Sequence, residues 1–336
     1  MVTVLEEQIA SGRGTLVRPS EISHLAIGNL VTLDLVAARR RYEHLFAFEC
    51  VEYAPGRMMA RDRRAKHLME TGVRDFFLLD IVEVDTIEHP QAMANHWGFS
   101  VSSREEVDRI REKLVKKSQE YGLRKIHPAL NMHNSYGFYL IDADENWWEV
   151  ECRGDIKHEV MFSRGDWDAS GREDFPMVSP PLDISTTASQ VFGPEAFMTH
   201  GTTAVISTRE SQHFYEDVLG LRYVRHGRPS SLFAGASDFA IVGLNSGDKI
   251  QDQGVENRFT ILVDSEEELE RLHAHVKNVR ETFGLQHVTG ITDGEFGGRA
   301  FLLRSKDQIW FEISSRSRQS YVDLFKSRQA EQFDRP

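Results

Sequence analysis

Cysteine, excess positive charge and long apolar runs are all scarce in this sequence. Two cysteines, Cys50 and Cys152, stand in 336 residues, too few for a disulfide framework or a CxxC metal site and typical of a reducing compartment. Lys and Arg number 40 against 52 Asp and Glu, so the net charge is −12 and the chain lacks the excess of Lys and Arg that favours binding to nucleic acid or an anionic membrane. No apolar run approaches the roughly 20 residues of a membrane span, and the opening MVTVLEEQIASGRG has no signal-peptide pattern. We therefore expect a cytoplasmic protein with neither nucleic acid nor membrane as partner.

What the sequence does contain is an ordinary folded composition, with 40% hydrophobic and 27% charged residues, and 14 histidines. Its length suggests two domains or one large one. Composition and length do not define the domain organisation, which we infer from patterns within the sequence.

Internal repetition is the first such pattern. HWGFSVSSREEVDRIREKL, from His96, lies over RFTILVDSEEELERLHAHV, from Arg258. Each segment reads as a short strand, then a Ser-x-x-Glu capping box at Ser103 or Ser265, then an amphipathic helix with apolar residues three and four positions apart. Two distant segments are thus expected to fold alike.

The same holds for two later segments. GFYLIDADENWWEVE (137–151) lies over RAFLLRSKDQIWFEIS (299–314), with Trp147 matching Trp310 and Glu149 matching Glu312. Both read as two strands joined by a polar turn.

The first halves of the two expected domains also correspond. One begins HLAIGN at His24 and the other HGTTAV at His200, and Tyr42 matches Tyr215 after a helix. Ser207 opens another capping box. The chain therefore contains four units, beginning near residues 22, 93, 198 and 256.

These units predict an α+β fold of four βαβββ modules paired into two domains. The N-terminal domain is expected at 20–153, with modules 22–90 and 93–153, and the C-terminal domain at 197–316. The stretch 154–196 is rich in Asp, Ser, Pro and Gly and is expected to connect the domains. Residues 317–336 are expected to form a C-terminal helix, which either covers a pocket or mediates assembly into a homo-oligomer.

Four such units, with a His opening the first strand and a Glu closing the last, resemble the vicinal oxygen chelate superfamily, which includes glyoxalases, bleomycin-resistance proteins and extradiol dioxygenases. The resemblance covers about 22–153 and 198–316. The turn from Asp142 to Glu149 follows the family pattern DPxGNxxE and departs from it at Ala143 and Glu145, where Pro and Gly are usual. The two-domain length looks like type I extradiol ring-cleaving dioxygenases. The resemblance implies that each domain is a curved mixed sheet enclosing a cavity.

The resemblance also implies a metal site made of His24, His96 and Glu149. Two neutral imidazoles and one carboxylate leave one side of a divalent ion open, which is the arrangement of non-haem Fe(II) oxygenases. Fe(II) is the expected metal, with Mn(II) as the alternative. Glu151 shares strand parity with Glu149 and is the rival carboxylate.

The matching positions of the second domain are His200, Arg258 and Glu312. A guanidinium offers no lone pair to a metal, so the C-terminal domain is expected to be degenerate and the N-terminal domain to hold one metal. Pairing the first unit with the fourth would place His24 with Arg258 and Glu312. This alternative lacks a second imidazole, so the sequence disfavours it.

Two further residues are candidates for catalysis. The family places a His and a Tyr just before the turn, and NMHNSYGFYLIDADENWWE offers His133 and Tyr139. His133 is suited to proton transfer because its ordinary pKa is near neutral, and Tyr139 is suited to donating a hydrogen bond.

The expected function is that of an Fe(II)-dependent extradiol dioxygenase, whose partners are a small aromatic diol and O2. Two alternatives stay open. One is another metal-dependent enzyme of the superfamily, an isomerase, epimerase or hydrolase, and the other is a metal-free protein that binds small molecules.

Overall fold

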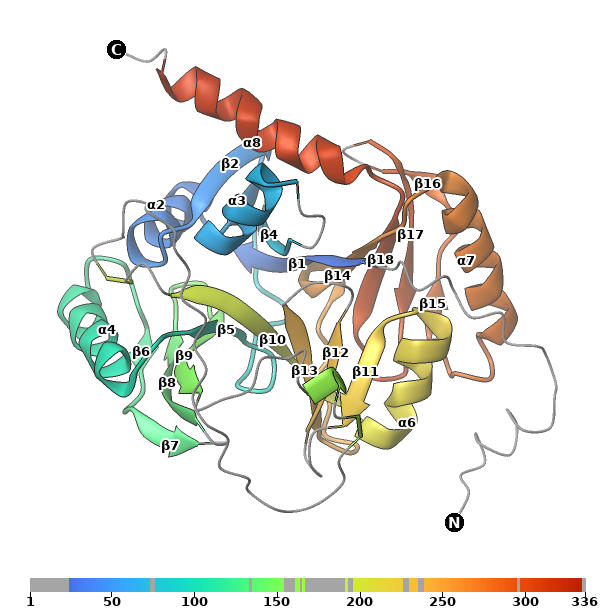
Figure 1. The fold of residues 1–336 in the computed structure, drawn as a ribbon, viewed down its shortest axis with the longest axis horizontal. Coiled ribbons are helices and arrows are strands. Elements are labelled where there is room, and N and C mark those ends of the chain that lie inside the picture. The colour runs from blue at the N-terminus through green and yellow to red at the C-terminus, as the bar shows by residue number, and fades with distance from the viewer. Residues whose placement is uncertain are drawn as a thin grey trace.

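The structure is a computed structural model. It describes the following residues: 24–72, 76–132, 135–153, 161–163, 165–166, 191–192, 196–225, 230–234, 239–294 and 297–333. Within them lie two curved mixed sheets of nine strands each, with helices packed around them (Figure 1). The predicted α+β class is confirmed in this form.

The first sheet combines strands from the two ends of the chain. Its order is β15-β17-β18-β14-β1-β4-β3-β2, with β16 beside β17. Its strands are β1 (His24–Thr32), β2 (Glu49–Ala54), β3 (Arg57–Arg61), β4 (Leu78–Glu83), β14 (Phe259–Leu262), β15 (His287–Val288), β16 (Thr292–Asp293), β17 (Arg299–Arg304) and β18 (Trp310–Ser314).

The second sheet is built from the middle of the chain. Its order is β11-β12-β13-β10-β5-β9-β8-β6, with β7 beside β8. Its strands are β5 (Trp97–Ser100), β6 (Lys125–Ile126), β7 (Leu130–Met132), β8 (Ser135–Ile141), β9 (Trp147–Arg153), β10 (Phe197–Val205), β11 (Arg222–Arg225), β12 (Ser230–Ala234) and β13 (Ala240–Asn245).

The way the units combine differs from the expected pairing of neighbours within 20–153 and 197–316. β1 pairs antiparallel with β14, and β5 pairs antiparallel with β10. The first unit therefore shares a sheet with the fourth, and the second with the third. Sequence repetition identifies which segments are alike, whereas strand pairing depends on which edges meet in three dimensions.

The helices follow the sequence signals closely. Ser103, Ser207 and Ser265 each accept a hydrogen bond from the backbone N–H three residues later, so all three predicted caps are confirmed. The helical segments are α2 (Leu35–Leu45), α3 (Arg63–Glu70), α4 (Arg104–Lys117), α6 (Thr208–His213), the π-helical η1 (Phe214–Val218), the 3₁₀ segment η2 (Val255–Asn257), α7 (Glu266–Val279) and α8 (Arg318–Phe333).

Neighbouring units contact one another through the polar turns rather than through a shared sheet. In the turn between β8 and β9, Asp144 accepts hydrogen bonds from Thr32 at 2.8 Å and from Arg41 at 2.9 Å. In the matching turn between β17 and β18, Asp307 accepts one from Ser211 at 2.8 Å. The DPxGNxxE-like segment thus joins the first unit to the second, and its counterpart joins the third to the fourth.

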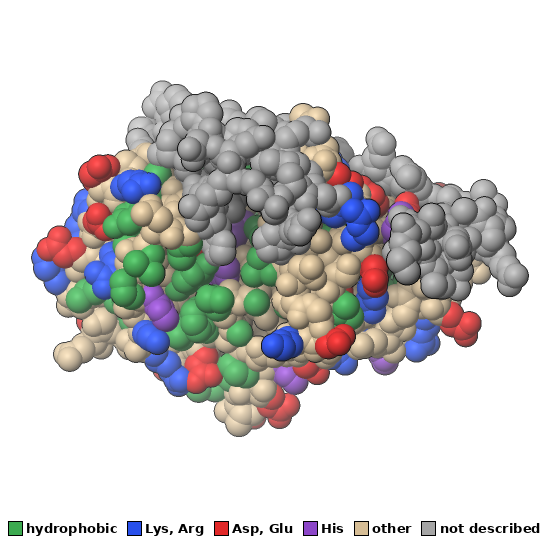
Figure 2. Space-filling model, turned by 90° about the horizontal axis from the view of Figure 1, so that it is seen from below, with side chains coloured by type: hydrophobic (Ala, Val, Ile, Leu, Met, Phe, Trp, Pro, Cys, Tyr) green, Lys and Arg blue, Asp and Glu red, His purple; other side chains and the backbone are tan. Residues whose placement is uncertain are grey.

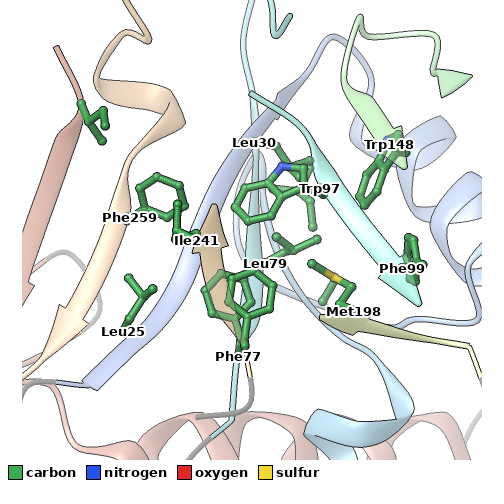
Figure 3. Close-up of a cluster of buried hydrophobic side chains, with 14 of the residues drawn as sticks. Leu25, Leu30, Phe77, Leu79, Trp97, Phe99, Trp148, Met198, Ile241 and Phe259 are labelled. Carbon is green, nitrogen blue, oxygen red and sulfur yellow. The ribbon is translucent and has the colours of Figure 1, made fainter. Parts of the chain in front are cut away.

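The two sheets meet at an apolar core centred on Trp97 (Figure 3). A Cβ placed on Gly28 or Gly201 would lie 2.0 or 2.9 Å from the Trp97 ring, so both strands approach the indole where they lack a side chain. Phe77 and Phe239 stack with ring centroids 3.5 Å apart. They hold equivalent places, each directly before the central strand β4 or β13, which gives the core an approximate twofold symmetry.

The predicted C-terminal helix is present as α8 and packs on the first sheet, next to β2 (Figure 1). Its Tyr321 and Phe325 join a buried apolar cluster with Ile27, Met59 and Leu78. None of the described helices combines the length and apolar character needed to cross a membrane.

Candidate metal centre

Strand register shows which residues of the two sheets occupy equivalent places. In the second sheet His200 of β10 lies opposite Gly98 of β5. In the first sheet Ile27 of β1 lies opposite Thr260 of β14. Both ladders have an irregularity just before this pair. His200 therefore corresponds to Ile27 and not to His24.

The other equivalences follow from the same ladders. The N–H of Thr202 donates to the carbonyl of His96 at 2.7 Å, and that of Asn29 donates to the carbonyl of Arg258 at 2.9 Å. Gly98 lies beside Glu149 in the second sheet as Thr260 lies beside Glu312 in the first. The first sheet thus carries Ile27, Arg258 and Glu312 where the second carries His200, His96 and Glu149.

His96, Glu149 and His200 converge in the second sheet. Glu149 Oε2 lies 3.0 Å from His96 Nε2 and 3.1 Å from His200 Nε2. One ligand atom from each side chain falls within 4.8 Å of the others, and within the described ranges this is the one such group of three. All three residues are buried, with at most 5% of their surface exposed. The cluster can hold a metal ion.

The outer nitrogens of both imidazoles are also engaged. Nδ1 of His96 lies 2.5 Å from the Met93 carbonyl oxygen, and Nδ1 of His200 lies 3.1 Å from the Thr199 hydroxyl. A carbonyl oxygen only accepts, so His96 Nδ1 carries a proton and donates it to Met93, while Nε2 faces the Glu149 carboxylate. Either a proton on Nε2 or a divalent cation satisfies such an arrangement, and metal-binding histidines usually have their other nitrogen held in this way. The residues present therefore fit a metal.

The electrostatics keep the carboxylate ionised. Burial alone would raise the pKa of Glu149, but the hydrogen bonds from His200 and His96 outweigh it and hold that pKa well below its usual range. An ionised carboxylate is the form that binds a cation.

His24, the predicted third ligand, lies outside this cluster, and His200 takes its place. His24 is buried in the first sheet, its Nε2 lies 2.9 Å from the Phe76 carbonyl oxygen, and its ring contacts the Phe76 ring edge-on. Burial in these surroundings lowers its pKa to about 4. The prediction placed His24 and Glu149 in one domain, whereas β1 and β9 belong to different sheets, so the structure does not bring these two side chains together.

The equivalent place in the first sheet is closed by an ion pair. Arg258 Nε donates to Glu312 Oε2 at 2.8 Å, so a guanidinium neutralises the carboxylate that corresponds to Glu149. The predicted combination of Arg258 with Glu312 is present, and Ile27 holds the position that corresponds to His200.

Of the predicted catalytic pair, Tyr139 lies at the centre. It is the direct cross-strand partner of Glu149, and its ring centroid lies 5.1 Å from that of His96. His133 lies outside the described residues. Glu151, the rival carboxylate, lies on the far side of His200, with Oε1 at 3.6 Å from Nδ1.

The sequence contained a signal for His200 that the repeat comparison did not use. Tyr42 matches Tyr215 at an offset of 173 residues, and the same offset sets Ile27 against His200 and Gly28 against Gly201. Matching His24 with His200 needs an offset of 176 and an insertion within the strand.

Comparison with known proteins shows the fold. No protein-family model and no curated protein sequence matches this chain. Among solved structures, glyoxalase I from Zea mays is 10% identical with a TM-score of 0.55, over 90% of this chain and 95% of the other. A proposed dioxygenase from Bacillus subtilis is 11% identical with a TM-score of 0.54, over 89% of this chain and 90% of the other. The chain therefore shares the fold of these two structures along most of its length.

Proposed function

We propose that this protein is a metal-dependent dioxygenase that cleaves a catechol-type ring beside its hydroxyl groups, with Fe(II) held by His96, Glu149 and His200. The observation that carries the proposal is this buried set of two imidazoles and one carboxylate. When bound, a ferrous ion in such a set supplies the electron-transfer chemistry between an ortho-diol and O2. Two of these three residues are those that the sequence suggested; His200 of β10 replaces His24 of β1, and the donor set of two imidazoles and one carboxylate is the same.

The chain's own residues hold and surround the reacting groups. His96 and His200 present Nε2 to the centre because Met93 and Thr199 engage their Nδ1 atoms. Tyr139, beside Glu149 on the neighbouring strand, is assigned to donate a hydrogen bond to a substrate oxygen. Thr202, whose Oγ1 lies 3.0 Å from His96 Nε2, is a second hydroxyl in contact with the centre.

Aromatic side chains continue from the centre along the same sheet. Tyr139 lies 6.2 Å from Trp147, and Trp147 lies 5.6 Å from His127, between ring centroids. All three side chains are half-buried. Figure 2 shows hydrophobic side chains gathered on one half of the face seen from below, with histidines among them. Such a row favours a flat, apolar ligand over a polar one.

The proposal is tested by loading the purified protein with Fe(II) without oxygen and then adding air and a panel of catechols. We expect O2 uptake together with a yellow ring-opened product, and neither from a Glu149→Ala variant. Metal binding without O2 uptake on any catechol would refute the dioxygenase. It would favour a redox-neutral superfamily enzyme of the glyoxalase type, which we would test with thiol adducts of 2-oxoaldehydes.

A further inference from the structure

A second buried carboxylate lies behind the candidate metal centre. Glu151 follows Glu149 by two positions on β9, so both side chains point to the same face of the sheet. Glu151 and His200 are each 1% exposed, and Glu151 Oε1 lies 3.6 Å from His200 Nδ1. The carboxylate therefore contacts the imidazole from the side opposite to Glu149.

Two hydroxyl groups extend this contact. The Thr199 hydroxyl lies 3.1 Å from His200 Nδ1, and the Ser100 hydroxyl lies 3.0 Å from that of Thr199. The Nδ1 edge of His200 thus faces polar atoms from β5, β9 and β10.

The first sheet provides an internal comparison, because each of these positions has an equivalent there. The equivalents are read from the paired ladders of the two sheets. His200 corresponds to Ile27, Glu151 to Ser314, Thr199 to Ala26 and Ser100 to Leu262. The second carboxylate and both neighbouring hydroxyls change where the imidazole is replaced, whereas the first carboxylate is kept as Glu312. Glu151 therefore accompanies the histidine and is not required by the sheet itself.

We propose that Glu151 is a positioning residue for His200. Its charge favours a proton on Nδ1, which leaves the Nε2 lone pair free for a metal and holds the ring in that orientation. This inference rests on the metal site proposed above and concerns its affinity for metal, not the reaction.

The test is a Co(II) titration of the full-length protein, read by the visible absorption of the bound ion and by calorimetry. Glu151→Gln keeps the size of the side chain and removes its charge. We expect it to weaken Co(II) binding by about 10–100-fold, the usual effect of removing such a partner, and to shift the absorption bands. Glu151→Asp should recover part of the affinity. Ser314→Ala, at the equivalent place in the first sheet, is the matched control and should stay within about twofold of wild type.

Unchanged affinity in Glu151→Gln would overturn the proposal. A complete loss, equal to that of Glu149→Gln, would also overturn it, because Glu151 would then be a ligand. If thermal unfolding of the metal-free protein shows that Glu151→Gln does not fold, Glu151→Asp takes its place. It should weaken binding by a smaller factor, and unchanged binding would again overturn the proposal. Failure of the dioxygenase alone leaves these titrations unaffected, whereas a wild type that binds no metal refutes both.

Discussion

Gly98 is the position where a single methyl group should disable the metal centre. A Cβ at this residue would lie 2.0 Å from His200 Cε1 and 2.2 Å from His200 Nε2. Carbon atoms in contact stay about 3.5 Å apart, so in Gly98→Ala the imidazole must move by roughly 1.5 Å. Metal–ligand distances tolerate only about 0.2 Å. We therefore expect metal affinity to fall by at least about 100-fold, since a displaced ligand costs more than a lost outer partner, and stability to fall by about 1–3 kcal/mol from overpacking.

The assay is a metal titration of wild type and Gly98→Ala, with urea unfolding of both metal-free proteins. Gly290→Ala is the control, because nothing lies within 4 Å of a Cβ at that position, and it should match wild type in affinity. If Gly98→Ala bound metal within about threefold of wild type while folded, His200 would not be a ligand in the geometry described here.

Three further changes test the surroundings. Burial lowers the pKa of His24 from an ordinary 6.5 to about 4 in the folded protein, so the unfolded chain takes up a proton on this residue first as the pH falls. The free energy of unfolding of wild type should therefore fall by about 2 kcal/mol between pH 7.5 and 5 through His24. Urea unfolding at both pH values should show that this loss is absent from His24→Gln. Ala47 follows α2 with a φ of 58°, a backbone conformation that suits glycine. Ala47→Gly should therefore raise the free energy of unfolding by about 0.5–1 kcal/mol in chemical unfolding, and a lower value than that of wild type would contradict this. Asp144→Ala leaves the buried guanidinium of Arg41 without its nearest carboxylate and should cost about 3 kcal/mol; a cost below about 1 kcal/mol in urea unfolding would show that this ion pair contributes little.

Local features of the fold could be predicted from the sequence because their causes are local. The caps at Ser103, Ser207 and Ser265 depend on side chains within three residues, and all three are present. The pairing of β1 with β14 joins residues more than 230 positions apart. It depends on how the core closes around Trp97, which no single segment encodes.

The candidate site was predicted only in part for the same reason. His96 and Glu149 belong to one unit, and their strands β5 and β9 are parallel neighbours, so their proximity follows from the unit itself. The third member of the cluster comes from whichever unit completes the sheet, and that is the third unit with His200. The apolar contacts of α8 with Ile27 likewise follow from the sheet pairing and not from the helix sequence.

The most direct test of the metal centre compares His200→Ala with His24→Ala in metal content and affinity. Both residues are buried histidines, on β1 and β10, and each is 1% exposed, so each substitution removes a similar volume. We expect His200→Ala to abolish binding of Fe(II) or Co(II) and His24→Ala to retain one metal per chain at close to wild-type affinity. Retained binding in His200→Ala together with loss in His24→Ala would contradict the site described here.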